Sequence, residues 1–130
     1  MKISTKSQYG LRALLVLAKN KAAIKTVADV ARSEKISRDY LEKIFARMER
    51  AGFVKSIRGA TGGYVLARPL KKITVKEFLI AMDGEIVPVQ CVSGIKCHMS
   101  KKCRAKNVWQ TVKNKVEKTL ESMTLETLTK

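Results

Sequence analysis

The sequence predicts a mainly α fold with a small β-hairpin wing, that is, a winged helix-turn-helix domain followed by a long C-terminal dimerisation helix. Apolar residues recur at helical spacing through most of the first 50 positions. Two short β-type runs follow around a glycine-rich tip, and a later stretch again has apolar residues four apart. Three helices followed by a hairpin is the element order of winged helix-turn-helix proteins, in which the second and third helices form the turn motif.

The first helix is expected over residues 7–20, where Leu11, Leu14 and Ala18 lie at helical spacing. A second, short helix is expected over 26–33. Its predicted N-cap is Thr26, because an acidic residue stands three positions later, close to a capping box.

The third helix is expected to begin after Ser37, a good capping residue, and to end at Gly52, which can take the left-handed conformation. The runs "FVKSIRG" and "GGYVLAR" then predict the two strands of the hairpin, and Pro69 stops the second strand. Another short helix, capped by Thr74, is expected to end at Met82.

The last predicted helix runs from about Arg104 to Leu120 or beyond. It carries a row of three valines followed by a leucine, each four residues after the one before. This apolar row has no obvious partner in so short a chain, which predicts a homodimer centred on the helix. We therefore divide the chain into a winged helix-turn-helix domain at 1–82, a cysteine-bearing loop at 83–103, and a dimerisation helix with a C-terminal tail at 104–130.

The net charge of +16 points to a polyanion as partner, nucleic acid first and an anionic membrane second. Residues 1–80 carry 18 basic and 6 acidic side chains, so the polyanion is expected to meet this part. The alternative is a lysine-rich surface that is merely solvated. No run is long enough to cross a bilayer and no signal peptide is recognisable, so a cytoplasmic protein without membrane contact is expected.

The predicted DNA-binding side chains lie on the third helix and on the hairpin. Base contacts are expected at the start of the helix, and phosphate contacts further along it. An arginine at the hairpin tip is suited to a narrow minor groove. In chain order the candidates are Ser37, Arg38, Asp39, Tyr40, Glu42 and Lys43 for bases, Arg47 and Arg50 for phosphates, and Lys55 and Arg58 on the hairpin.

All three cysteines, Cys91, Cys97 and Cys103, lie in one polar stretch, with five residues between each pair. In a reducing compartment such a group indicates metal binding or redox activity rather than disulfides. Structural zinc sites prefer cysteine pairs two to four residues apart, so this spacing argues mildly against zinc. Nearby basic residues would lower the thiol pKa values.

No catalytic pair or phosphate-binding loop is evident, so an enzyme is not expected.

The stretches "MKISTKSQYGLRALLVLA", "ISRDYLEKIFARMERAGFVKSIRGATGGYVLAR" and "ITVKEFLIAMDGE", together with the three cysteines, resemble the Rrf2 superfamily of bacterial transcription regulators, in particular its IscR-type and NsrR-type iron–sulfur members. The resemblance implies a homodimer on a roughly palindromic double-stranded operator. It also implies that Arg58 is the wing arginine and that Glu42 lies at a position tied to operator choice. By resemblance, the three cysteines hold an iron–sulfur cluster of the 2Fe–2S or 4Fe–4S type.

The fourth cluster ligand departs from that pattern. IscR-type members have a histidine three positions after the third cysteine, where this chain has Lys106. NsrR-type members can use an aspartate near the N-terminus, where this chain has Gln8. The single histidine, His98, directly follows Cys97, and adjacent residues seldom bind one metal well. We therefore expect three protein ligands and one exchangeable position.

Three functions remain open at this point. The first is a regulator, expected to be a repressor, whose operator binding responds to iron–sulfur status, oxygen or nitric oxide. The second is a thiol-dependent or zinc-dependent regulator without a cluster. The third is a non-specific structural DNA-binding protein, which would lose its preference for any sequence once salt is raised.

Overall fold

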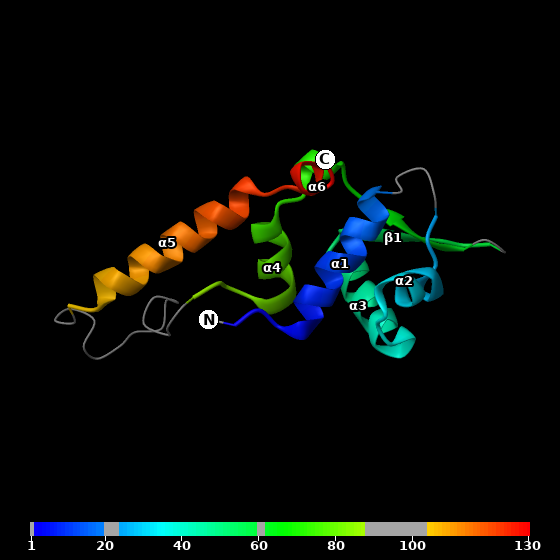
Figure 1. The fold of residues 1–130 in the computed structure, drawn as a ribbon, viewed down its shortest axis with the longest axis horizontal. Coiled ribbons are helices and arrows are strands. Elements are labelled where there is room, and N and C mark those ends of the chain that lie inside the picture. The colour runs from blue at the N-terminus through cyan, green and yellow to red at the C-terminus, as the bar shows by residue number, and fades with distance from the viewer. Residues whose placement is uncertain (1, 20–23, 60–61, 88–103) are drawn as a thin grey trace.

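The computed structural model describes residues 2–19, 24–59, 62–87 and 104–130. These residues form a helical head with a projecting β-hairpin and a long helix that leads away from the head at the opposite end (Figure 1). The elements are α1 (Thr5–Lys19), α2 (Val27–Glu34), α3 (Arg38–Arg50), β1 (Val54–Ile57), β2 (Gly63–Leu66), the 3-10 helix η1 (Leu70–Lys72), α4 (Val75–Asp83), α5 (Lys106–Ser122) and α6 (Leu125–Leu128). The predicted mainly α fold with a hairpin wing is confirmed.

The core lies between α1, α3 and α4. Leu14 of α1, Phe45 of α3 and Phe78 of α4 have no exposed surface, and the ring of Phe53, just before β1, packs edge-on against Phe78 at 5.4 Å between centroids. Burying apolar side chains of this size is the main stabilising contribution in such a domain.

Local capping signals fix where the helices begin and end. The Thr26 hydroxyl accepts the Asp29 amide at 3.0 Å while the Asp29 carboxylate accepts the Thr26 amide at 3.1 Å, a complete capping box. Hydrogen bonds from Thr26 lower the pKa of Asp29. Gly52 follows α3 with a φ of 84°, the left-handed conformation expected of it.

The hairpin is an antiparallel pair in which Ser56 lies opposite Tyr64. Lys25, in the segment before α2, extends this small sheet on the other side of β2, because Lys25 and Tyr64 exchange both backbone hydrogen bonds. The contact is tight: a Cβ atom on Gly63 would lie 2.5 Å from the carbonyl oxygen of Lys25, so this position has no room for a side chain.

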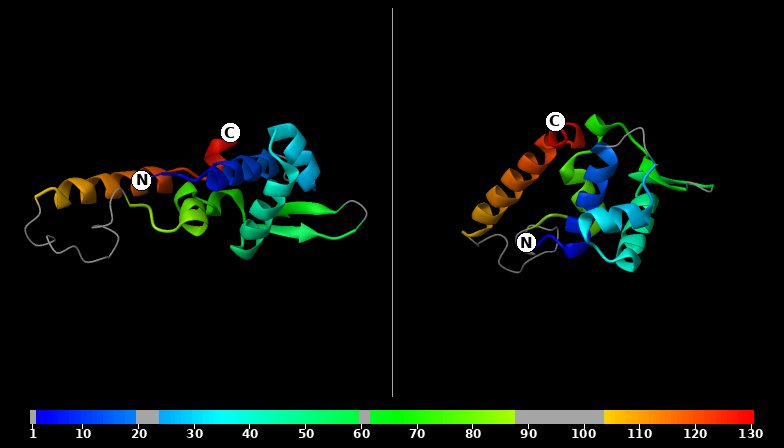
Figure 2. Two further views of the ribbon diagram at one scale, coloured as in Figure 1. Left: turned by 90° about the horizontal axis from the view of Figure 1, so that it is seen from below. Right: turned by 45° about the vertical axis from the view of Figure 1, so that its right-hand side comes forward.

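The C-terminal tail that follows the long helix packs against the head. Residues Thr124 and Thr74 form a bridge, the Leu125 amide donates to the Ile73 carbonyl at 3.0 Å, and Leu125 is buried in the core. The short helix α6 therefore anchors the C-terminal end of α5 to the head beside η1, while the other end of α5 reaches away from it (Figures 1 and 2).

None of the helices in the described part of the chain is long and apolar enough to cross a membrane.

Candidate nucleic-acid interface

The turn between α2 and α3 sets the crossing of the two helices. Lys35 ends α2 in the left-handed conformation, with φ 58° and ψ 46°, an uncommon state for a residue with a side chain. Ser37 then caps α3 and accepts the Tyr40 amide at 3.4 Å. Between them Ile36 is buried, so the turn is held against the core by its apolar middle residue.

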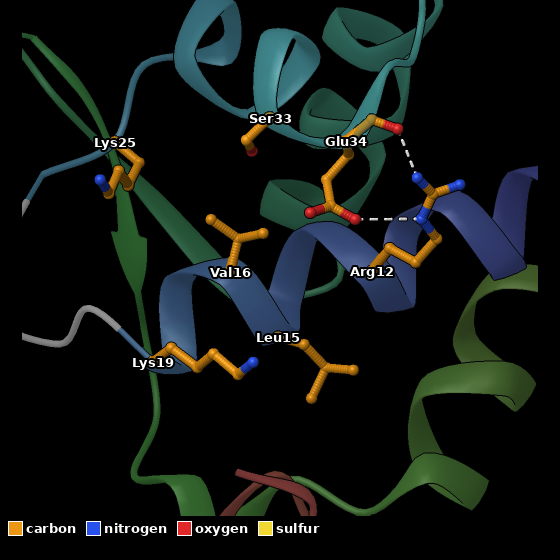
Figure 3. Close-up of a pocket in the computed structure, with 7 residues that line it drawn as sticks. All are labelled: Arg12, Leu15, Val16, Lys19, Lys25, Ser33 and Glu34. Carbon is orange, nitrogen blue, oxygen red and sulfur yellow. Dashed lines mark hydrogen bonds and ion pairs between the residues drawn. The ribbon is translucent and has the colours of Figure 1, made fainter.

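An arginine of α1 braces this turn from behind. The Arg12 Nε donates to the Glu34 carboxylate at 3.1 Å, and a second guanidinium nitrogen donates to the Glu34 backbone carbonyl, one of the free carbonyls at the end of α2 (Figure 3). Arg12 also lies over the Tyr9 ring at 5.4 Å, and Tyr9 meets Tyr40 edge-on at 5.9 Å. Tyr40, predicted to face bases, is therefore half-buried against α1.

A cavity of about 410 Å³ lies between α1 and α2 and is lined in part by Leu15, Val16 and Lys19 of α1 and by Lys25, which precedes α2. Figure 3 shows these side chains. The cavity is open to solvent and lies behind the turn.

The exposed face of α3 carries most of the predicted base-contacting residues. Ser37, Arg38, Asp39, Glu42, Lys43 and Arg50 are all exposed. The Arg38 Nε lies 3.2 Å from the Glu42 carboxylate, so these two neighbours pair in the free protein. Both remain largely solvated, and an exposed pair of this kind is weak enough to open when DNA arrives.

Arg47 points elsewhere. Its guanidinium donates to the backbone carbonyls of Ala81 at 3.4 Å and Met82 at 3.2 Å, near the C-terminal end of α4. A cation is favourable there because the helix end carries unsatisfied carbonyls and partial negative charge. The phosphate contact that the sequence suggested for Arg47 would require these bonds to break.

The hairpin presents the remaining predicted residues. Lys55 and Arg58 are both exposed, on β1 and just beyond it. The hairpin is fastened to α3 by stacking of Phe45 on Tyr64, with ring centroids 4.6 Å apart. A second tie joins the Ser56 amide to the Glu49 carboxylate at 2.9 Å. Burial, together with the carboxylates of Glu49 and Glu42, raises the pKa of Tyr64.

The α4 end forms a junction with other elements. The Asp83 carboxylate accepts the Ser4 hydroxyl at 2.6 Å and the Ser4 amide at 3.1 Å, just before α1 begins. Beyond α4, Glu85 accepts from the Lys113 ammonium of α5 at 2.8 Å, a bond that raises the pKa of Lys113. The chain then leads into the cysteine stretch.

Cys91, Cys97, Cys103 and His98 lie outside the described residues. Within the described ranges no group of three or more histidine, cysteine, aspartate or glutamate side chains could hold a metal. Lys106 is the first residue of α5, and the Gln8 side chain is exposed and donates to the Ile3 carbonyl at 2.9 Å. The cluster site therefore stays a prediction from the sequence.

A family model for Rrf2, described as an iron-dependent transcriptional regulator, matches residues 3–130. The chain belongs to the Rrf2 family. It is a DNA-binding transcription regulator, and the winged-helix reading of its element order is confirmed by solved relatives.

Two kinds of named regulator in this family have similar sequence identity to the chain. The structure of CymR, described as the global cysteine regulator of Bacillus subtilis, aligns with a TM-score of 0.84 and 35% identity, over 99% of this chain and 96% of that one. The HTH-type transcriptional regulator IscR of Escherichia coli is 31% identical over 96% of this chain and 78% of its own. A structure of Staphylococcus aureus CymR in an oxidized form aligns with a TM-score of 0.80 and 30% identity, over 100% of this chain and 97% of that one. These relatives are named as regulators rather than enzymes.

Sequence reasoning missed the side chains that brace the interface, namely Arg12, Glu34 and Glu49. Each acts through a partner in another element, and no local pattern marks such a pair. A usable hint was available for Glu49, because an acidic residue between basic ones, near a hairpin predicted to bind DNA, suggests a role other than DNA contact.

Proposed function

We propose that this regulator binds a double-stranded, roughly palindromic operator as a homodimer and represses transcription from it. The carrying observation is the exposed start of α3 with Arg38 and Lys43, beside a hairpin that presents Lys55 and Arg58. Side chains at the start of the third helix are suited to base edges in the major groove, and the hairpin arginine to an adjacent minor groove.

An unpartnered stripe on α5 supports the homodimer. Val108, Trp109 and Val112 are 53, 36 and 37% exposed, which is unusual for large apolar side chains gathered on one helix. The stripe lies toward the end of α5 that reaches away from the head, whereas Val116 and Leu120 pack against the regulator's own core. A second copy offering the same stripe would cover it in a two-fold arrangement.

We further propose that Cys91, Cys97 and Cys103 control operator binding by holding an iron–sulfur cluster. The donor chemistry fits, because cluster irons take thiolate ligands and three close cysteines can reach one inorganic core. The first turn of α5 offers Lys106 rather than a histidine, and a protonated amine is not a ligand. When bound, such a cluster supplies reactivity toward oxygen or nitric oxide. The chain's own contribution would be the three thiolates, which come from the segment that connects α4 to α5 in the sequence.

A thiol-based switch without a cluster is the second candidate. The relative described as a global cysteine regulator matches as well as the IscR relatives do, and a related regulator has a structure in an oxidized form. Three thiols within a basic stretch would also suit oxidation chemistry, since nearby cations favour the thiolate.

Anaerobic purification separates these two candidates. A brown protein whose visible absorption disappears in each Cys→Ala variant supports the cluster. A colourless protein whose operator binding changes with thiol oxidation supports the thiol switch. Binding is measured on operator and on random DNA of equal length at rising salt. If the affinities for operator and random DNA stay equal as the salt concentration rises, both candidates fail, and the protein binds DNA non-specifically as a structural protein.

A further inference from the structure

Glu49 is a negative charge where a DNA-binding surface would be expected to avoid one. It lies in the last turn of α3, it is exposed, and it is next to Arg50 and near the hairpin. A carboxylate close to DNA phosphates is repelled by them, so its presence there requires a compensating contribution.

The geometry of the hairpin shows what Glu49 contacts. Tyr64 uses both its amide and its carbonyl on Lys25, on the side of β2 that faces away from β1. In an antiparallel ladder, the residue opposite Tyr64 must then be in a non-hydrogen-bonded pair, with its own amide and carbonyl directed outward. That residue is Ser56. Its outward amide donates to the Glu49 carboxylate at 2.9 Å.

Glu49 thus holds the outer edge of β1 against the last turn of α3. Two other contacts join α3 to the hairpin: the Phe53 amide donates to the Met48 carbonyl at 3.0 Å at the base of the hairpin, and Phe45 stacks on Tyr64 of β2, opposite Ser56. The Glu49 tie lies closest in sequence to Arg58, two residues beyond Ser56. It therefore constrains the direction in which β1 carries Arg58 away from the helix.

We propose that Glu49 is a positioning residue that fixes the angle between the recognition helix α3 and the wing, so that Arg58 and α3 reach their grooves together. The inference rests on the proposed wing contact of Arg58. It predicts that removing the acceptor for the Ser56 amide weakens operator binding, even though the same change removes a negative charge that DNA phosphates would repel.

Two variants separate positioning from charge. Glu49→Ala removes both the charge and the acceptor for the Ser56 amide. Glu49→Gln removes the same charge but keeps a side-chain oxygen that can accept it. Each is made alone and together with Arg58→Ala, and operator affinity is measured at fixed salt. Hydrogen exchange of the Ser56 amide reports on the tie, and thermal unfolding shows that each variant is folded.

We expect Glu49→Gln to bind the operator as tightly as the unaltered protein or more tightly. Glu49→Ala should bind about threefold to tenfold more weakly than Glu49→Gln, the scale of one lost hydrogen bond to a side chain. Its Ser56 amide should exchange faster. Arg58→Ala should then weaken binding strongly in the Glu49→Gln background and only slightly in the Glu49→Ala background.

If Glu49→Ala binds the operator as tightly as Glu49→Gln, or more tightly, the carboxylate acts through its charge alone and the inference is wrong. If Arg58→Ala weakens binding by the same factor in all backgrounds, the wing contact stands and the positioning role falls. If Arg58→Ala changes nothing in the unaltered protein, the proposed wing contact fails and the inference falls with it.

Discussion

Arg58 is the residue on which the wing contact depends, and it stands exposed directly after β1. If it reads a base edge or a narrow minor groove, Arg58→Ala should weaken operator binding by about 1–3 kcal/mol. If it meets phosphate alone, the loss should be similar on all sequences and the salt slope should fall by about one unit. Lys118→Ala is the matched control, because it removes the same charge from an exposed position on α5. Unchanged binding on both DNAs would remove the hairpin from the interface.

Asp83 gives the free energy of unfolding a pH dependence that can be tested. Burial alone would raise its pKa, but hydrogen bonds, those from Ser4 foremost, and the positive charge of Lys6 together outweigh burial and lower the pKa below its usual value. The charged form is therefore stabilised in the folded state. This stability is present above the unfolded pKa of about 3.9 and is lost as the pH falls through the lower folded pKa.

Thermal unfolding from pH 6 to pH 3 checks this prediction. The unaltered protein should exceed Asp83→Asn in unfolding temperature at pH 6, and the difference should shrink below about pH 4. Asp39→Asn, at the start of α3, serves as a control, because the change falls on an exposed carboxylate away from this junction. A difference that stays constant over the whole range would mean that the Asp83 charge contributes nothing.

At the scale of elements, Arg47 joins α3 to α4. Arg47→Met should leave the carbonyls of Ala81 and Met82 without their donor, and we expect the protein to lose about 1–3 kcal/mol of unfolding free energy. The salt slope of DNA binding should stay the same, because the guanidinium faces α4. Denaturant titration and salt titration measure the two effects. Arg50→Met, on the exposed side of α3, should show the reverse pattern. A reduced salt slope for Arg47→Met with unchanged stability would restore the phosphate contact.

Which elements the sequence could predict depends on how local their causes are. The N-caps Thr26, Ser37 and Thr74 were predictable because each bonds an amide three residues away. The left-handed Lys35 was not, since Ile36 and the core impose it. Thr74 caps α4, and Glu77 stands three residues later, where its side chain could complete a capping box. Its carboxylate instead pairs with Arg68 at 2.6 Å, a contact that no local pattern shows.

The helix α6 escaped prediction for the same reason. Four residues make too short a helix to form alone. Leu125 is held against the core because its amide donates to the Ile73 carbonyl, while the Val75 amide donates to the Met123 carbonyl. The candidate interface shows the same division. The exposed residues of α3 and the wing could be chosen from spacing and charge, whereas Arg12, Arg47 and Glu49 acquire their roles from contacts distant in sequence.

For the molecule as a whole, the cysteine stretch predicts how a cluster would respond to ligand changes. We expect Cys91→Ala, Cys97→Ala or Cys103→Ala to abolish visible absorption in anaerobically purified protein, and His98→Ala to leave it nearly unchanged. Lys106→His should restore a ligand where IscR-type members have one, and so slow the loss of absorption in air. If His98→Ala bleaches the protein as fully as a cysteine change, the histidine is the fourth ligand and the exchangeable position does not exist.

The homodimer can be tested because one part of the apolar row on α5 packs against the core of the same chain, while another part is exposed to solvent. Val116 packs partly against the regulator's own core, so changing it would mix folding with assembly. Val108 and Val112 are exposed, and Val108→Asp with Val112→Asp should therefore yield folded monomers in sedimentation. Two charges facing each other in an apolar, two-fold interface are costly because every change occurs twice.

Asn107→Asp with Asn114→Asp is the matched control for that pair. It adds the same two charges to exposed positions on the opposite side of α5, so the dimer should persist.

Operator binding gives a second test of the dimer. The two double variants should differ more in their affinity for the full operator than in their affinity for a single half-site. One head makes half the contacts, and joining two heads raises the affinity through effective concentration. The affinity of the monomeric variant for the full operator should therefore be close to its affinity for a single half-site. A Val108→Asp, Val112→Asp protein that sediments as a dimer would show that the α5 stripe is covered in some other way.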